Sequence, residues 1–520
     1  MTKKKRNIII ISVVAAVCVA ALVLTLVLVL TLKKPQDRTY TVTFNSNGGT
    51  VVAAVTDIPY DTTIAEPAAP VREGYVFEGW FKESSLENAW KFDTDTVKKD
   101  VTLYAKWRYN ATDGFEFKIV GSSAIIVGIG TAGEVKNVVI PSIYGNLPVT
   151  SIADGLFRGN GAVETVYIPE SVTSVGNNLF RACPNLVSVT FAGESTALGS
   201  TVFYDCQKLV RVTLPKNITM ITAETFYNCL SLKEFKIPSS VTEIQKSAFQ
   251  FCAALTEFAL PDKLTTIGEQ AFAGCSALTA VNIPSAVTSI GELAFSGCYG
   301  VESMTMSPGN TKYFGEGNCI VEISSQDGTP KFTVIAGCKN SNMTSISSST
   351  PISAIGVGAF SACRYLTNIS IPSTVTSIGD YAFQACDRLQ NVTIPASVKT
   401  IGEMAFAKCN RLQYVRFLSA ENGQDEVPLE IGKEAFYDCI TSQTELSISL
   451  PKRLAKLGEG AFWWNPIYDE ENLRVSYAGS QTEFSQSVKT PVDYDTNRYK
   501  RPTLIWCTDG NDNIDVFGLA

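Results

Sequence analysis

Histidine is absent from the 520 residues of this chain. Its absence excludes the Ser-His-Asp triad, the Cys-His dyad and every metal site that is built on imidazole. The fourteen cysteines include no C-x-x-C pair, so the clustered spacing of a typical metal site is missing too. Composition leaves carboxylate or lysine catalysis open, but we expect neither a cofactor nor a metal ion.

Positive charge is scarce after the N-terminal segment. Residues 39–520 carry 36 basic and 49 acidic side chains, which gives this part of the chain a net charge of −13. A surface of that sign repels phosphate backbones, and no basic stripe with interleaved aromatic residues is visible along the sequence. We therefore expect no nucleic-acid partner.

The longest uncharged run lies near the N-terminus, at residues 8–32. As a helix that rises about 1.5 Å per residue it is about 37 Å long, enough to cross a hydrocarbon core of about 30 Å. No Ala-x-Ala pattern follows, which favours an uncleaved signal anchor over a cleaved signal peptide. We predict a cytoplasmic tail at 1–7, a transmembrane anchor at 8–32, a linker at 33–38 and the remainder outside the cell. Residues 3–6 carry only slightly more positive charge than the opposite flank, so the reverse orientation stays open.

A repeat of 23 residues fills the larger part of the chain. Phe249, Phe272 and Phe295 are 23 residues apart, and the cysteines three positions after them keep the same spacing. A fixed period in the twenties is the signature of a solenoid. The register has twelve phenylalanine anchors: Phe157, Phe180, Phe203, Phe226, Phe249, Phe272, Phe295, Phe360, Phe383, Phe406, Phe436 and Phe462.

Within one period the apolar positions alternate as in a strand. Val281 and Ile283 point to one face, and Pro284 closes the strand because it has no N–H to donate. Residues 291–295 have room for a single helical turn. Since 23 residues are too few for a βαβ unit of roughly 30, each period predicts one coil of a β-rich, leucine-rich-repeat-like solenoid whose stacked coils form a joint core.

The strings IPSSVTEIQKSAFQFC, IPSAVTSIGELAFSGC and IPSTVTSIGDYAFQAC resemble the BspA-type leucine-rich repeat. The resemblance covers roughly residues 135–485. It implies a curved, right-handed solenoid of 23-residue coils on a cell surface, and several members of that family are regarded as adhesins. We place an N-terminal cap at 109–145, the repeats at 146–485 and a C-terminal cap or tail at 486–520.

Residues 39–108 have a different texture. A strand-like segment runs into the turn Asn-Ser-Asn-Gly-Gly at 45–49, and the motifs GYVFEGW and LYAKW follow. This pattern is similar to the Listeria–Bacteroides repeat, also called the internalin B repeat, and implies a small β-grasp-like module of bacterial surface proteins. Phe77, Trp80 and Trp107 could form a ligand platform, but we favour a role in the core of so small a domain.

Two insertions interrupt the repeat. The segments Cys319–Ile323 and Lys331–Ile335 alternate and are separated by turn residues, which predicts a hairpin near 315–338 that projects from, or caps, one edge of the solenoid. Residues 420–427 form an acidic loop. Asp425 and Glu426 within it suggest a calcium or glycosidase site, but we favour a solvated loop.

Ten of the fourteen cysteines lie three residues after an anchor. Stacked coils are about 4.8 Å apart, which lies within the range that a disulfide allows. Parallel neighbours in register nevertheless point their side chains the same way, an arrangement that suits the bond poorly. We favour a column of buried free thiols that pack as small apolar groups.

The solvent face of the strands is the expected binding surface. Its best aromatic and basic candidates are Tyr414 with Arg416, Arg211 with Lys236, and Tyr167, because binding energy concentrates in such residues. These candidates suggest a non-enzymatic protein for cell-surface recognition or adhesion, with an extracellular protein or glycan as its ligand. The alternative is a structural scaffold of the cell envelope. A carboxylate-driven hydrolase is a third hypothesis, for which Glu234 and Glu257 are the nearest pair of acids.

Overall fold

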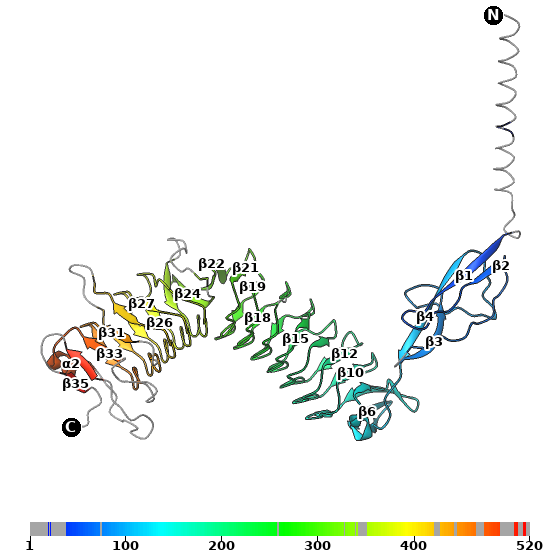
Figure 1. Ribbon diagram of the computed structural model, residues 1–520, viewed down its shortest axis with the longest axis horizontal. Helices are drawn as coiled ribbons and strands as arrows, with labels where there is room; N and C mark the ends of the chain where they lie inside the picture. Colours follow the sequence, from blue (N-terminus) through cyan, green and yellow to red (C-terminus); the bar gives the residue numbers. More distant parts are fainter. Residues whose placement is uncertain are drawn as a thin grey trace, which may run out of the picture. The chain divides into compact units, whose positions relative to one another are not determined.

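The structure is a computed structural model. It contains two compact units, Met1–Ala111 and Thr112–Ala520, which are drawn in Figure 1. The first unit ends three residues after the boundary that the sequence predicts. The structure describes residues 19, 21, 38–72, 75–256, 259–326, 328–338, 340–341, 351–420, 427–440, 445–463, 473–488, 504–507 and 513–515.

The first unit is a mixed four-stranded sheet with the order β2-β1-β4-β3. The central strands β1 and β4 are parallel, whereas β2 and β3 run antiparallel to their neighbours at the two edges. Residues 38–72 and 75–111 include no helix. The strands are β1 (Thr39–Asn45), β2 (Val55–Pro59), β3 (Tyr75–Phe81) and β4 (Val101–Tyr109).

Aromatic side chains build the core of this unit. Trp80 is only 1% exposed and meets Phe44 and Phe77 edge to face, with ring centroids 4.8 and 5.4 Å apart. Phe77 meets Trp107 in the same way at 5.4 Å, and the Trp107 Nε1–H donates to the Ser46 carbonyl at 2.9 Å. The aromatic residues therefore pack against one another as a core, as the sequence favours, rather than as an open platform.

The second unit is a solenoid with two walls, each made of parallel strands (Figure 1). Each coil contributes a strand to one wall or to both. The first wall consists of β7 (Asn137–Val139), β10 (Thr165–Ile168), β12 (Ser188–Phe191), β14 (Arg211–Thr213), β16 (Glu234–Phe235), β19 (Ala280–Ile283), β21 (Ser303–Met306), β27 (Asn391–Ile394), β29 (Tyr414–Phe417), β31 (Leu446–Leu450) and β33 (Leu473–Tyr477). The second wall consists of β9 (Leu147–Ile152), β11 (Ser174–Val175), β13 (Ala197–Leu198), β15 (Met220–Ile221), β17 (Glu243–Ile244), β18 (Thr266–Ile267), β20 (Ser289–Ile290), β25 (Ile352–Ile355), β26 (Ser377–Ile378), β28 (Thr400–Ile401), β30 (Leu429–Ile431) and β32 (Leu454–Leu457).

The 23-residue period keeps neighbouring coils in register. Val166 pairs with Val189, and Val189 with Val212, so the same apolar column runs through β10, β12 and β14. These valines are at most 4% exposed, while the residues beside them face solvent. A strand of three or four residues cannot bury its apolar side alone, so the stacking itself creates the core and confirms the solenoid prediction.

The corner of each coil is not the helical turn that the sequence suggested. Leu293, within residues 291–295, has φ 58°, and the equivalent Gln270 has φ 55°. A left-handed residue at this point breaks a right-handed helical turn. Alternate corner amides donate to the next coil, as Phe272 N–H does to the Ala294 carbonyl at 2.9 Å, and the amides between them close turns within the coil, as Ala273 N–H does to the Gln270 carbonyl at 3.1 Å. The corner is therefore a series of turns hydrogen-bonded to the next coil and not a helical turn.

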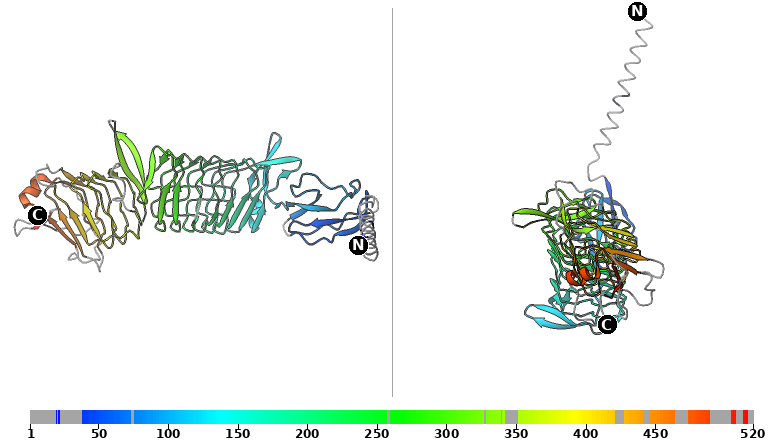
Figure 2. Two further views of the ribbon diagram at one scale, coloured as in Figure 1. Left: turned by 90° about the horizontal axis from the view of Figure 1, so that it is seen from above. Right: turned by 90° about the vertical axis from the view of Figure 1, so that its left-hand side faces the viewer.

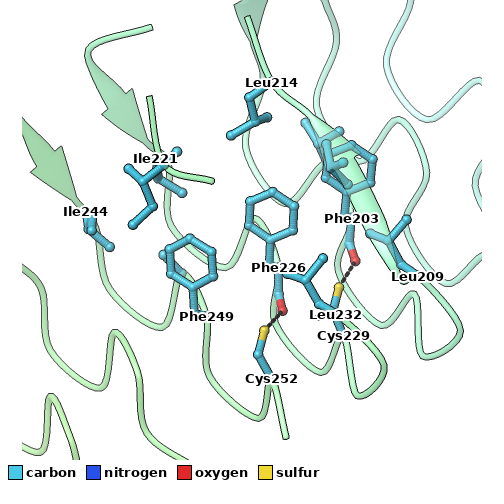
Figure 3. Close-up of a cluster of buried hydrophobic side chains, with 14 of the residues drawn as sticks. Phe203, Leu209, Leu214, Ile221, Phe226, Cys229, Leu232, Ile244, Phe249 and Cys252 are labelled. Atoms are coloured by element: carbon cyan, nitrogen blue, oxygen red, sulfur yellow. Dashed lines mark hydrogen bonds between the residues drawn. The ribbon is translucent and has the colours of Figure 1, made fainter. Parts of the chain in front are cut away.

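The anchor phenylalanines stack into a column inside these corners (Figure 3). Phe272 is fully buried, and its ring centroid lies 5.3 Å from that of Phe249 and 5.6 Å from that of Phe295, with interplanar angles of 1° and 3°. The second half of the solenoid repeats this geometry from Phe360 to Phe462. Within each half, an anchor ring such as Phe272 thus contacts an anchor ring in the coil on either side.

The cysteine column is a row of free thiols. The twelve cysteines whose state the structure describes are all free and buried. The Cys252 and Cys229 thiols each donate to the carbonyl of an anchor, Phe226 or Phe203, at 3.2 and 3.1 Å (Figure 3). Burial raises the pKa of the Cys439 thiol to about 12. The expected thiol column is therefore confirmed, and its S–H groups satisfy backbone acceptors between coils.

A hairpin interrupts the stack. It consists of β23 (Cys319–Gln326) and β24 (Thr329–Gly337), with the short strand β22 (Tyr313–Glu316) paired to β23. Its outer part projects from the row of coils, drawn in light green on the left of Figure 2. The base of the hairpin joins the two halves of the solenoid. Ile320 packs in the core of the first half, and Val321 packs in the core of the second half.

Gly337, the last residue of β24, takes the place of an anchor at this junction. Its N–H donates to the Ala359 carbonyl, as an anchor N–H does in other coils, and its carbonyl accepts from the Cys363 thiol at 3.6 Å. A side chain there has no room, since an added Cβ would lie 2.1 Å from the Phe360 ring. The phenylalanine column therefore stops at Phe295 and begins again at Phe360.

Antiparallel strands cover the two ends of the solenoid. At the N-terminal end β5 (Glu116–Val120) and β6 (Ser123–Gly128) form a hairpin beside β9, followed by the 3-10 helix η2 (Gly130–Glu134) and the short strand β8 (Ile143–Tyr144). At the C-terminal end the elements are α2 (Gln481–Ser487), β34 (Leu504–Cys507) and β35 (Asn513–Asp515).

The N-terminal run at residues 8–32 lies almost wholly outside the described residues. Among the residues that are described, no helix is both long and apolar enough to cross a membrane. The transmembrane anchor stays a prediction.

Candidate binding surface of the solenoid

The outer side of the first wall is polar and open. In β27 and β29 the residues alternate between exposed and buried positions, so every second side chain meets solvent. Most of the exposed positions carry Ser, Thr or Asn. A few large side chains stand out against this background.

Tyr414 and Arg416 are the strongest of these on the first wall. Tyr414 is 61% exposed, and Arg416 follows two positions later on the same face of β29. The neighbouring strands place Asn391 and Ser447 beside Tyr414, and Thr393 and Ser449 beside Arg416. The structure thus brings this predicted pair together on an open surface with small neighbours.

The other predicted candidates lie in the first half of the solenoid. Arg211 is exposed on β14, and Lys236 is exposed just after β16. Tyr167 is half-buried on β10, two coils before Arg211. The hairpin separates these three residues from Tyr414, so the candidates form no single patch.

The acids proposed for hydrolysis gain no support. Glu257 and residues 421–426, which include Asp425 and Glu426, lie outside the described residues. In the part of the chain that the structure describes, no group of three or more Cys, Asp or Glu side chains could hold a metal ion.

Sequence reasoning missed a set of residues at the corner between the thiol column and the first wall. Arg364 lies over the Tyr299 ring with its guanidinium 5.2 Å from the ring centroid, and Arg388 lies 4.8 Å from that of Tyr365. The two tyrosine rings meet at 6.4 Å. We call the cysteines that lie three residues after an anchor the register cysteines. Each of these four residues lies one or two positions after a register cysteine, and this shared position could have revealed them in the sequence.

A second aromatic row lies in the first half, beside the anchors. Arg181 lies 4.3 Å from the centroid of Tyr204, and Tyr204 stacks on Tyr227 at 4.6 Å. Phe251 meets Tyr227 edge to face at 5.6 Å and is 41% exposed. Burial, with Tyr204 close by, raises the pKa of the Tyr227 hydroxyl, so this hydroxyl remains neutral at physiological pH.

Two family models match the chain. The BspA type Leucine rich repeat region matches in six copies, over residues 133–256, 243–319 and 336–467. The Listeria-Bacteroides repeat domain matches residues 40–106. Together these segments include most of the residues that form the two units.

Among curated proteins, a putative Gly-rich membrane protein of Evansella cellulosilytica is 51% identical over 71 residues, which are 14% of this chain and 8% of that protein. Internalin H of Listeria monocytogenes is 34% identical over 79 residues, or 15% of this chain and 14% of that protein. The chain thus spans only a small part of these relatives.

Among solved structures, a leucine rich cell surface protein from Faecalibacterium prausnitzii superposes with a TM-score of 0.58 at 27% identity. That match covers 73% of this chain and 99% of the solved chain.

Proposed function

The chain belongs to the BspA-type leucine-rich-repeat family, and from this premise we propose that it is a cell-surface recognition protein. In this proposal its solenoid binds an extracellular protein or glycan and catalyses no reaction. Residues 8–32 anchor the chain in the cytoplasmic membrane, and residues 39–520 lie outside the cell.

The exposure of Tyr414 carries the proposal. A tyrosine that is 61% exposed next to an arginine, on a wall of small polar residues, is the arrangement in which interface energy concentrates. The similar solved protein is described as a cell surface protein, and 99% of its length aligns with this chain. Relatives that match a stretch of 71 or 79 residues of this chain include a putative Gly-rich membrane protein and an internalin.

A binding array tests the proposal. The purified full chain is applied to immobilised extracellular matrix proteins and cell-wall polysaccharides, and the Kd is measured for each ligand retained. We expect at least one ligand to bind, and Tyr414→Ala with Arg416→Ala to weaken it by about 30-fold, since a hot spot contributes roughly 2 kcal/mol.

The matched control is Thr190→Ala with Thr213→Ala, which shortens a half-buried and an exposed side chain in the first half of the same wall. The control should bind like the unaltered chain. Binding of no ligand at all would contradict recognition through the solenoid, and equal losses in both double variants would place the site away from Tyr414.

A further inference from the structure

Three successive coils in the second half of the solenoid carry a concentration of arginine at one corner. The corner lies between the thiol column and the first wall, at the two positions after each register cysteine. We call it the arginine–tyrosine patch, and its members are Tyr299, Arg364, Tyr365, Arg388 and Arg411.

The backbone brings these residues together although Tyr299 and Arg364 are 65 positions apart. The Gly297 N–H donates to the Ser361 carbonyl at 3.0 Å, so the coil of Phe295 lies directly beside the coil of Phe360 at this corner. Tyr299 and Arg364 both follow their register cysteine by one position. Because the coils before and after the hairpin are hydrogen-bonded to each other, Tyr299 and Arg364 lie in one column.

Backbone hydrogen bonds also fix the positions of Arg388 and Arg411, which lie on neighbouring coils. The Ala385 N–H donates to the Ala407 carbonyl, and the Gln413 N–H donates to the Gln390 carbonyl, both at 2.8 Å. These bonds lie on either side of the two arginines and fix the coils in register. The spacing of the arginines along the solenoid is therefore the strand spacing of about 4.8 Å.

The patch is open to solvent. Tyr365 is 44% exposed, the side chain of Arg364 is 54% exposed, and Arg388 and Arg411 are also exposed. One carboxylate accompanies the cations, since Asp387 pairs with Arg364 at 3.4 Å. Lys408, two positions after its anchor, is also exposed, and Asp438 takes the equivalent position in the next coil, so these two charges offset each other. The corner therefore keeps a positive balance.

At the two positions after the cysteine, arginine occurs only in these coils among the described residues. The equivalent positions in the first half are mostly neutral: Pro184, Asn185, Gln207, Lys208, Leu230, Ser231, Ala253, Ala254, Ser276 and Ala277. A positive patch of this size is an exception on a chain whose residues 39–520 carry a net charge of −13.

We propose that the arginine–tyrosine patch binds an acidic polysaccharide, a linear glycan with a carboxylate on successive sugars, which lies along the solenoid axis. The guanidinium groups match carboxylates bidentately, and the tyrosine rings offer apolar surface to the C–H faces of the sugars.

Periodicity favours a polymer over a folded protein. The cations recur once per coil, at about 4.8 Å, which is close to the length of one sugar in a glycan chain. A linear glycan with a carboxylate on each sugar repeats its charge at a similar interval along its whole length. The inference rests on the proposed recognition function and names its ligand class. Tyr414 and Arg416 lie on the same coil as Arg411, next to the patch.

Polygalacturonate is the probe that tests this inference, because it is a linear polymer with one carboxylate on each sugar. The Kd for the full chain is measured at low salt and again at high salt. We expect binding that weakens with salt, and we expect Arg388→Glu with Arg411→Glu to weaken it by at least about 30-fold.

The matched control is Lys208→Glu with Lys233→Glu, which changes the net charge equally on exposed positions of the first half. It should keep the affinity of the unaltered chain within about threefold. The thermal midpoint of each double variant shows that both solenoids remain folded.

Three results would overturn the inference: equal losses in the two double variants, undiminished binding to fully methyl-esterified polygalacturonate, or tighter binding to polyglutamate or a single-stranded oligonucleotide. If the chain does not bind polygalacturonate but binds a matrix protein or a neutral glycan, the inference fails while the proposed recognition function stands.

Discussion

Replacing Phe272 by alanine is expected to lower the free energy of unfolding of the solenoid by about 4 kcal/mol or more. The side chain is fully buried, and removing such a ring typically costs about 3–5 kcal/mol. The rings of Phe249 and Phe295 each lose a stacked neighbour, which adds roughly 0.5–1.5 kcal/mol per pair. Because a coil packs mainly against its nearest neighbours, the loss uncouples the two sides of the stack and broadens the transition.

Denaturant unfolding followed by circular dichroism measures this effect. Cys275→Ala is the control, since its thiol lies in the same coil and is also fully buried. It should cost about 1 kcal/mol, on the scale of one small apolar group. A loss for Phe272→Ala no larger than that of Cys275→Ala would contradict the stacked column.

Replacing Arg453 by methionine is expected to cost about 3 kcal/mol. Arg453 is 6% exposed, and its guanidinium donates to the carbonyls of Val398 at 2.6 Å, Val427 at 3.1 Å and Pro395 at 3.2 Å. Methionine keeps the apolar bulk but donates nothing. The Pro395 carbonyl still accepts from the Val398 N–H at 3.2 Å, whereas the Val398 and Val427 carbonyls lose the guanidinium donor, at a cost of about 1–3 kcal/mol each. Arg453 thus fastens two earlier coils to the one that follows the acidic loop.

The same unfolding measurement tests this role. Lys452→Met is the control, because Lys452 is adjacent in sequence but its side chain is 58% exposed and forms only a surface ion pair with Glu483 at 3.4 Å. Its loss should stay within about 0.5 kcal/mol. Equal stability of the two variants would show that the buried hydrogen bonds of Arg453 contribute nothing net.

The repeat could be predicted from the sequence because large buried side chains recur with its period. Phe249, Phe272 and Phe295 recur at 23 residues, and each occupies the same place in its coil. The thiol column followed from the same register. When the repeats have equal length, equivalent residues of neighbouring coils stack on one another.

The corner conformation was not predictable from the same residues. Leu293 and Gln270 are ordinary helix formers, yet both have positive φ. Hydrogen bonds to the next coil override that local preference, and such bonds appear only once the coils are stacked. The helical-turn prediction therefore failed for a tertiary reason.

The arginine–tyrosine patch was hidden for a related reason. A scan along the sequence finds no basic stripe with interleaved aromatic residues, because Tyr299 and Arg364 are separated by the hairpin insertion. The insertion looks like a break in the repeat, but the Gly297–Ser361 hydrogen bond closes the stack across it. Tyr414 and Arg416 could be found because alternation within one strand reveals its exposed face.

Surface display is the central claim of this account, and protease treatment of intact cells tests it most directly. Residues 39–520 are proposed to lie outside the cell and to remain attached through residues 8–32. Mass spectrometry of the released peptides should then recover segments of the solenoid from intact cells, while a cytosolic marker protein stays uncut. Solenoid peptides that appear only after lysis would contradict the claim and place the repeats in the cytosol.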